Sequence, residues 1–252
     1  MFLLPKNYYS VKKIRNKGRG VFVAKTIEAG TVVGDYMGMI INDSQIAKHE
    51  KACGEACYAM DYDGNGHSIF PADIKALGVH LINHSCSANC GTYYDRGHTL
   101  FFALRRLFPG EELSIDYSFD PSGDGVVDNR RELLHFCYCN SPFCRGTMYN
   151  SQEKIDRLGD YFYRQNIGRS FEAQKAGEKL KPLADYPKSI NDDETFDLYA
   201  SLEEKPLILL DDKLPSIKEL RRQLRASGRR LRFQGFGFEL IGVSGDNIII
   251  NK

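Results

Sequence analysis

The sequence has no long apolar run, almost no net charge and no internal repeat or low-complexity segment. A membrane-spanning helix needs about 20 consecutive apolar residues, and no stretch of the 252 residues approaches that length. The short apolar start ends at Pro5 and Lys6, well before it reaches the length of a signal peptide's apolar region. We therefore expect a globular, intracellular protein without a membrane partner.

The near balance of charge weakens the case for nucleic acid as a partner. Lys and Arg number 34 against 33 Asp and Glu, a net charge of +1, so the whole molecule has little field to attract nucleic acid. Such a contact must come from a local patch. One basic run could dock on DNA or an acidic partner, or could be a solvated helix face; it comprises Lys218, Arg221, Arg222, Arg225, Arg229, Arg230 and Arg232.

The cysteines favour metal binding over disulfides. There are seven, an odd number, and a disulfide framework is not expected in a reducing compartment. Cys137, Cys139 and Cys144 supply three thiolates around a polar turn, and a closed structural zinc site needs a fourth ligand. Cys86 is the natural candidate. Zinc bound there would attach the tail to the middle of the chain.

A second set of ligand types occurs earlier in the chain. Residues 42–44 are suitable helix caps, and His49, Cys53 and Cys57 follow at four-residue intervals, which would place them on one helical face. They could form another metal site, or they could be reduced thiols packed under a helix, which is the better interpretation. Gly54 indicates that this helix is short.

The first half of the chain has the pattern of short strands. Residues 8–41 alternate β-branched segments with glycines, 58–70 indicate a strand, a turn and a returning strand, and 99–104 indicate another strand. Gly18-Arg19-Gly20 is either a tight turn or a place where backbone approaches a ligand. It is not a phosphate-binding loop, because the later glycines and the Lys-Ser/Thr pair are missing.

The composition changes after Gly146. We expect helices within 154–179, a connector over 182–194 rich in Pro and Asp, and a short amphipathic helix beginning at Ser216. Three closing strands follow in the pattern, over 231–233, 238–241 and 247–250.

Several motifs, taken in order, resemble the SET-domain protein-lysine methyltransferases with a cysteine-rich post-SET segment. They are Lys17-Gly18-Arg19-Gly20, Asp35-Tyr36-Met37-Gly38, Tyr58-Ala59-Met60, Asn83-His84-Ser85-Cys86-Ser87-Ala88-Asn89-Cys90, Gly110-Glu111-Glu112-Leu113, Asp116-Tyr117 and Cys137-x-Cys139-x4-Cys144-Arg145-Gly146. The resemblance covers about residues 8–149. It implies an α+β, mainly β, SET fold of short twisted sheets in which the stretch at Asn83 threads under Asp116-Tyr117 as a pseudoknot. The expected domains are 1–120 (SET), 121–150 (post-SET zinc segment) and 151–252 (C-terminal extension).

The resemblance also implies an activity and a set of site residues. The protein is expected to transfer a methyl group from S-adenosylmethionine to a lysine amine, with histone tails the favoured substrate. It would act at chromatin if the chain is eukaryotic, and otherwise in the cytoplasm or on host chromatin. Catalysis is assigned to Tyr117 and Tyr58. Cofactor binding is assigned to Lys17, Gly18, Arg19, Gly20, Tyr58, Asn83, His84, Tyr117, His135 and Met148.

The chemistry supports this assignment. Methyl transfer from a sulfonium needs a neutral amine, whereas free lysine has a pKa of about 10.4. A narrow apolar channel and the nearby sulfonium charge both favour the neutral form, and tyrosine hydroxyls can aim its lone pair. Each residue also has a plainer role open to it: Tyr117 could be strand packing, and Asn83 with His84 could be a buried polar pair.

Some positions depart from the family pattern. Ala88 stands where the family usually has Pro. Met39 stands after Gly38, where the family often has Glu, and residues 70–72 replace a more usual Ile-Asp-Ala. Ile115 precedes the catalytic position by two residues and is not aromatic, while Phe119 follows it by two. We expect di- or trimethylation, because Ile115 offers no hydroxyl to hold a water in the channel.

Two other functions stay open. The chain could be an inactive SET-like module that serves as a zinc-stabilised interaction domain, although Tyr117, Asn83 and His84 are all present. It could also be a nucleic-acid-binding zinc finger. The lack of a His pair beside the cysteines and the low net charge make the finger a poor fit.

Overall fold

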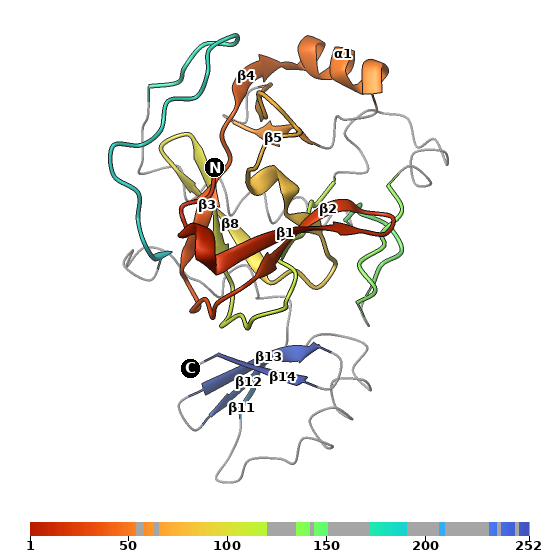
Figure 1. Cartoon of the computed structure of the whole chain (residues 1–252), viewed down its shortest axis with the longest axis vertical. Helices are drawn as coiled ribbons and strands as arrows, with labels where there is room; N and C mark the ends of the chain where they lie inside the picture. The colour runs from red at the N-terminus through yellow and green to blue at the C-terminus, as the bar shows by residue number, and fades with distance from the viewer. Residues whose placement is uncertain are drawn as a thin grey trace.

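The computed structural model describes residues 1–53, 58–62, 66–119, 135–141, 144–150 and 172–190, together with four short strands nearer the C-terminus. Figure 1 shows the described residues as mostly strands, with a single α-helix among them. Within these residues no helix is both long enough and apolar enough to span a lipid bilayer.

The chain begins with a hairpin. After a 3-10 turn, η1 (Lys6–Tyr8), strand β1 (Tyr9–Ile14) pairs antiparallel with β2 (Gly18–Val23). The turn between them needs left-handed backbone at Asn16 (φ 64°) and Gly18 (φ 76°), which glycine and asparagine adopt at the least steric cost. The turn itself lies at residues 15–17, so of the predicted Gly18-Arg19-Gly20 turn only Gly18 adjoins it, and Gly20 lies within β2.

The core lies around a three-stranded sheet in the order β3-β9-β8. Its strands are β3 (Val32–Asp35), β8 (Cys90–Asp95) and β9 (His98–Ala103), and every residue of β9 is buried. Burial on both faces explains the continuous apolar run from Leu100 to Ala103, because such a strand has no solvent-facing side that would need polar residues.

A second three-stranded sheet has the order β4-β6-β5 and leads into the helix. It contains β4 (Met39–Asn42), β5 (Met60–Asp61) and β6 (His67–Phe70), and α1 (Asp43–Cys53) follows β4. Asn42 caps the helix reciprocally with Gln45: its Oδ1 accepts the Gln45 N–H (3.1 Å), and its own N–H donates to Gln45 Oε1 (3.0 Å). The predicted cap is confirmed, whereas Gly54 lies outside the described residues.

The predicted alignment of His49, Cys53 and Cys57 as a second metal site lies outside what the structure describes, because the side chains of His49 and Cys53 and the whole of Cys57 are not among the described parts.

Two central stretches lie side by side, as expected for the pseudoknot. After η3 (Val79–Leu81), the short strand β7 (Asn83–His84) pairs parallel with β10 (Ser114–Ile115). The side chain of Asn89 reinforces the pairing: its Oδ1 accepts the Ser114 N–H (2.9 Å) and its Nδ2 donates to the Glu112 carbonyl (2.8 Å). The pairing brings the Asn-His pair alongside the stretch that leads to Tyr117.

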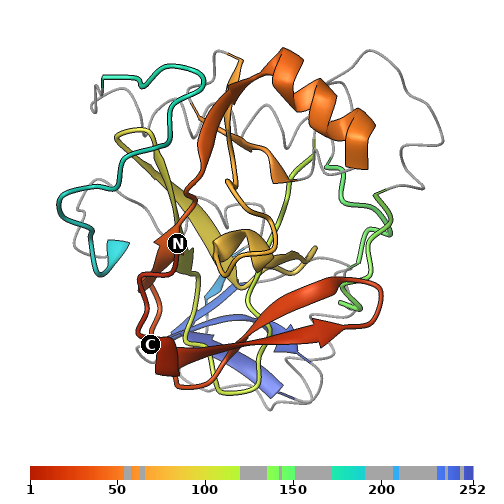
Figure 2. The same cartoon turned by 45° about the horizontal axis from the view of Figure 1, so that its top comes forward.

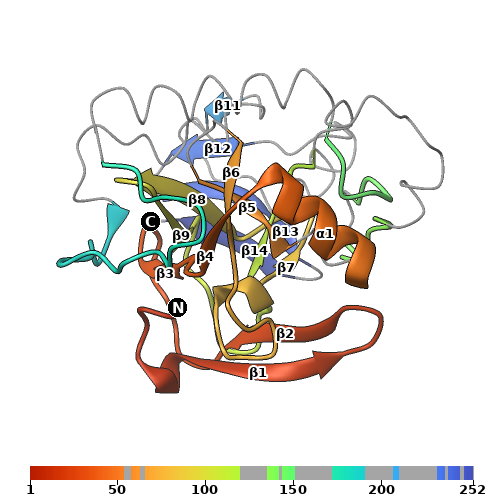
Figure 3. The ribbon, with the colours of Figure 1, turned by 90° about the horizontal axis from the view of Figure 1, so that it is seen from above.

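Residues 172–190, here called the strap, run along the edges of both three-stranded sheets. The Gly177 N–H donates to the Ile40 carbonyl (2.8 Å), the Ile40 N–H donates to the Glu178 carbonyl (2.8 Å), and Ser189 forms a β-bridge with Thr31. Figure 3 shows the strap in cyan beside β4 and β3. The predicted helix is therefore wrong for residues 172–179, because their backbone groups pair with a sheet edge instead of with one another. Residues 154–171 lie outside the described part.

The strap is anchored by two buried side chains, Leu180 (3% exposed) and Ile190 (1% exposed), each packed in a different part of the core. Replacing Leu180 with alanine is expected to lower the free energy of unfolding by about 2–4 kcal/mol, because it opens a cavity in a core that cannot fully collapse. Leu77→Ala, at a leucine that is 54% exposed, is the matched control and should change little. Urea titration of both variants measures the difference; equal effects would contradict the burial of the strap.

Four C-terminal strands form one sheet of their own, in the order β11-β12-β13-β14. They are β11 (Leu207–Leu209), β12 (Arg232–Gly235), β13 (Phe238–Ser244) and β14 (Asn247–Asn251), and only β11 and β12 pair in parallel. The three predicted closing strands are confirmed as β12 to β14. The predicted helix after Ser216 and the basic run before Arg232 lie outside the described residues.

Candidate active site and metal centre

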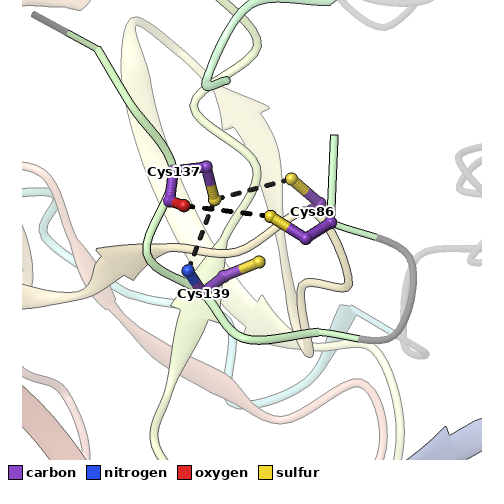
Figure 4. A group of neighbouring side chains, drawn as sticks. Cys86, Cys137 and Cys139 are labelled. Atoms are coloured by element: carbon purple, nitrogen blue, oxygen red, sulfur yellow. Dashed lines mark hydrogen bonds between the residues drawn. The ribbon is translucent and has the colours of Figure 1, made fainter. Parts of the chain in front are cut away.

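The sulfur atoms of Cys86, Cys137, Cys139 and Cys144 all lie within 4.8 Å of one another. Figure 4 shows the sulfurs of the three labelled cysteines turned toward a common centre. The Sγ atoms of Cys86 and Cys137 are 3.6 Å apart, close to the separation of about 3.8 Å expected for two thiolates in a tetrahedral zinc site with bonds of about 2.3 Å. The predicted set of four is therefore brought together, and its chemistry fits a structural zinc ion.

Backbone N–H groups also point at these sulfurs. Cys139 donates to Cys137 Sγ (3.4 Å), Arg145 to Cys86 Sγ (3.3 Å) and Gly146 to Cys144 Sγ (3.4 Å). Burial raises the pKa of the Cys137 thiol. Burial acts on Cys139 in the same direction, but hydrogen bonds from backbone and neighbouring thiols outweigh it and lower its pKa to about 7. Donors converging on sulfur favour the thiolate, which is the form that binds metal.

Cys90 belongs to the same sequence stretch as Cys86 but not to the cluster. It is 2% exposed in the apolar core, where burial raises the pKa of its thiol to about 12. It therefore stays protonated and behaves as a small apolar side chain.

Asn83 and the end of the first hairpin are joined by Glu112. The Asn83 amide donates to the Arg19 carbonyl (3.0 Å) and to Glu112 Oε1 (2.9 Å), while Lys17 Nζ forms an ion pair with Glu112 Oε2 (2.7 Å). Both amide hydrogens of Asn83 are used in this way, so its Oδ1 is the atom that can accept a hydrogen bond from a ligand.

The glycines of this turn have different functions. A Cβ on Gly20 would come within 2.9 Å of Asn83 Nδ2 and 2.3 Å of Ile14 Cδ1, so any side chain there would displace those of Asn83 and Ile14. A Cβ on Gly18 would meet no atom within 4 Å, so glycine is needed there for the positive φ and not for space. The Arg19 guanidinium is tied to the carbonyls of Ile74 (2.8 Å) and Lys75 (2.7 Å), which leaves the backbone of Arg19 to face Asn83.

Tyr117 lies where the two central stretches meet. Its hydroxyl donates to the Ile82 carbonyl (3.3 Å), and its backbone N–H donates to His84 Nδ1 (3.1 Å). The Tyr117 and His84 rings meet edge-on at 5.4 Å between centroids. The predicted catalytic tyrosine is thus held at the hydroxyl end and at the backbone, next to Asn83.

Tyr58 is held by a second tyrosine. The buried Tyr36 donates its hydroxyl to the Tyr58 carbonyl (2.6 Å), and the Tyr58 ring meets His80 edge-on at 6.1 Å. Tyr36 is 4% exposed and packs in the main core. The Tyr36 hydroxyl therefore fixes the Tyr58 backbone from the core side.

The post-SET residues form an aromatic group next to Tyr117. The His135 ring packs against Phe119 (4.9 Å) and Tyr149 (5.5 Å), and Phe119 packs against Tyr117 (5.6 Å). The Met148 N–H donates to the His135 carbonyl (3.0 Å). In Figure 2 these segments, in green, lie on the same side as the tip of the β1-β2 hairpin. His135 and Met148, both assigned to cofactor binding, therefore belong to the group next to Tyr117, although their contact with a ligand stays a prediction.

Three residues act in this site without having been assigned a role from the sequence: Glu112, Asp116 and Arg145. Arg145 forms a bidentate ion pair with Asp116, with both N–O distances 2.9 Å, so the cysteine-rich tail is fixed to the residue before Tyr117. The motifs contain all three, and a charged residue inside such a motif is the only signal that could have suggested a role.

Comparison with known proteins identifies a domain in the N-terminal half of the chain. The family model described as "SET domain" matches residues 18–118. These residues are a SET domain. The match runs from the first glycine of β2 to the residue after Tyr117, so it contains Asn83, His84 and Glu112. The predicted fold class, a mainly β SET fold, is confirmed.

Curated relatives of this SET domain carry methyltransferase names. The chain is 34% identical over 147 residues to histone-lysine N-methyltransferase trithorax of Drosophila virilis, 33% over 135 residues to human histone-lysine N-methyltransferase 2B, and 32% over 148 residues to the H3 lysine-9 specific SUVH5 of Arabidopsis thaliana. The matches cover 56%, 51% and 54% of this chain but only 4%, 5% and 18% of those relatives.

A solved structure, KRYPTONITE in complex with mCHG DNA and SAH, is similar at a TM-score of 0.44 and 24% identity, over 57% of this chain and 29% of that one.

Proposed function

We propose that this chain is an S-adenosylmethionine-dependent protein-lysine N-methyltransferase that acts on histone tails. The observation that carries the proposal is the position of Tyr117, whose hydroxyl lies 3.3 Å from the Ile82 carbonyl directly before Asn83. The SET domain and the names of its relatives support the same reaction class.

Tyr117 and its neighbours would orient the accepting amine. A hydroxyl and a carbonyl that converge can aim an amine's lone pair and polarise a methyl group, and such positioning supplies much of the rate enhancement in transfer reactions. The hydroxyl can keep this geometry because the Tyr117 N–H is fixed to His84 and its ring packs against His84 and Phe119. Apolar neighbours such as the buried Ile115 favour the neutral amine by desolvation.

The methyl donor would bind between the hairpin end and Asn83. Bound there, it supplies an electrophilic methyl group on a sulfonium. Asn83 Oδ1 can accept from an ammonium group, because Glu112 and the Arg19 carbonyl take both amide hydrogens. His84 and Gly20 would contribute backbone, and His135 and Met148 would close the site from the post-SET side.

Zinc held by Cys86, Cys137, Cys139 and Cys144 would fix the post-SET segment. Four thiolates form a closed coordination set with no open position, so the ion would stabilise structure and take no part in the transfer. Its binding free energy would become folding free energy of the tail.

The names of the relatives support the proposed substrate and place of action. Their names specify histone lysines, so we propose a nuclear or host-chromatin location, with a histone tail as the favoured partner. Docking of the basic run 218–232 on DNA or on an acidic partner stays a separate prediction.

The expected domain limits 1–120, 121–150 and 151–252 are kept, except that the strap belongs to the SET core by its contacts.

The test is mass spectrometry of core histones incubated with the protein and S-adenosylmethionine. Mass gains in steps of one methyl group are expected. Two or three steps on one lysine are expected, because Ile115 offers no hydroxyl to hold a water in the channel. Cofactor binding without a gain on any histone would contradict the histone substrate. If the protein neither binds S-adenosylmethionine nor transfers methyl groups, the inactive interaction module is favoured.

Replacing Glu112 with glutamine is expected to weaken S-adenosylmethionine binding about tenfold. The change removes the charge that pairs with Lys17 and leaves a weaker, neutral acceptor for the Asn83 amide, and a hydrogen bond to a charged group contributes about 1.5–3 kcal/mol. Isothermal titration calorimetry measures the change. Glu28→Gln is the control, because Glu28 pairs with Arg106 at the surface with 60% of its side chain exposed; equal weakening in both variants would contradict the role of Glu112.

A further inference from the structure

Two hydrogen bonds converge on one sulfur of the metal centre, and both lead to Tyr117. The Cys86 Sγ atom lies 3.4 Å from His84 Nε2 and accepts the Arg145 N–H at 3.3 Å. His84 holds the Tyr117 backbone, and Arg145 holds Asp116. Cys86 is therefore common to two short paths between the sulfur cluster and the Asp116-Tyr117 pair.

The first path fixes the tautomer of His84. Its Nδ1 accepts the backbone N–H of Tyr117 at 3.1 Å, so that nitrogen carries a lone pair and the ring proton is on Nε2. Nε2 then donates to Cys86 Sγ. Asp116 Oδ1 also lies 3.5 Å from Nδ1, but a nitrogen that accepts a hydrogen bond through its lone pair has no proton to donate to this carboxylate. Asp116 is held by Arg145 instead.

The second path is an ion pair from the other side of the sulfur. The Arg145 guanidinium donates twice to Asp116 at 2.9 Å, and Arg145 Nε donates to the Tyr149 carbonyl (3.2 Å). Bidentate pairing fixes direction as well as distance. The loop that carries Cys144 and Arg145 is thus locked to the residue before Tyr117.

We propose that His84 and Arg145 are positioning residues that make the geometry of Tyr117 depend on metal in the sulfur cluster. The inference rests on the proposed function for its catalytic meaning. A bound metal fixes Cys86 Sγ in space, and both donors are fixed with it. When the metal leaves, Cys86 Sγ, the acceptor in both paths, is free to move. The His84 ring, which accepts the backbone N–H of Tyr117, then loses its fixed position.

The experiment measures amide hydrogen exchange of Tyr117 by NMR, with zinc bound and after removal of zinc by EDTA, without methyl donor or substrate. In the wild-type protein, removal should speed exchange about tenfold, because the Tyr117 amide then opens locally more often. His84→Asn keeps an acceptor near the Nδ1 position and loses the donor to sulfur. Arg145→Met keeps the apolar stem and loses the guanidinium.

Each single variant should retain part of the metal dependence, and the double variant should lose it, with less than about a twofold change on EDTA addition. His98→Asn is the matched control. His98 is also buried, but it pairs with Asp35 at 2.7 Å, so its variant should keep the full wild-type response. A double variant that still shows the tenfold response would overturn the proposal, because disorder of the tail alone would then explain it.

A second measurement does not require any variant to fold. The ¹⁵N shifts of the His84 ring in the zinc-bound wild type should place the proton on Nε2, and a proton on Nδ1 would overturn the first path. Because neither readout uses turnover, failure of methyl transfer in a parallel assay would count against the proposed function and leave the metal linkage standing.

Discussion

Tyr117→Phe is expected to reduce methyl transfer by about 100-fold or more while leaving the fold intact. The substitution removes only the hydroxyl that donates to the Ile82 carbonyl and would orient the amine, and removal of one such polar group from a transfer site costs about 100–1,000-fold in rate. The ring contacts with His84 and Phe119 stay, so the melting temperature should change by less than about 2 °C.

The measurement is the rate of methyl addition to histones by mass spectrometry, with thermal unfolding recorded in parallel. Tyr9→Phe is the control, because Tyr9 is stacked on Phe2 (4.1 Å) on the first hairpin and has no place in the proposed site. Unchanged transfer by Tyr117→Phe would show that the hydroxyl is dispensable. A large fall in melting temperature would show that it is structural.

Cys137→Ser should remove zinc and with it methyl transfer. Cys137 is buried, its sulfur is 3.6 Å from that of Cys86, and loss of one of four thiolates leaves an incomplete set for the metal. Structural zinc contributes roughly 10–16 kcal/mol of apparent binding free energy in small zinc domains, so the post-SET segment should lose its order. Transfer should fall below detection, since His135, Met148 and Arg145 all belong to that segment.

Metal content by inductively coupled plasma mass spectrometry should be about one zinc per wild-type chain and near zero in Cys137→Ser. Cys90→Ala is the control: Cys90 is equally buried but outside the cluster, so its variant should keep the metal. A wild-type chain that purifies without zinc and still transfers methyl groups would contradict the structural role of the cysteines.

Features set by local sequence were predictable from the chain alone. The turn at Gly18 follows from a backbone conformation that few residues adopt, the cap at Asn42 from a side chain that satisfies helix N–H groups, and β9 from a continuous apolar run. The cysteine cluster was predictable for a similar reason, because only a few side chains bind zinc and their spacing is informative.

Contacts between distant charged and polar groups were decided by tertiary structure. Lys17 meets Glu112 across 95 positions of sequence, and Arg145 meets Asp116 across 29, through the register of strands and loops that no local pattern encodes. The strap shows the same limit: the composition of residues 172–179 suits a helix, but an open sheet edge beside Ile40 offered their backbone other partners. The sequence by itself therefore determined the chemical groups of the site and most of its strands. Only the tertiary structure decided which of those groups hold one another, because that depends on packing between elements far apart in the chain.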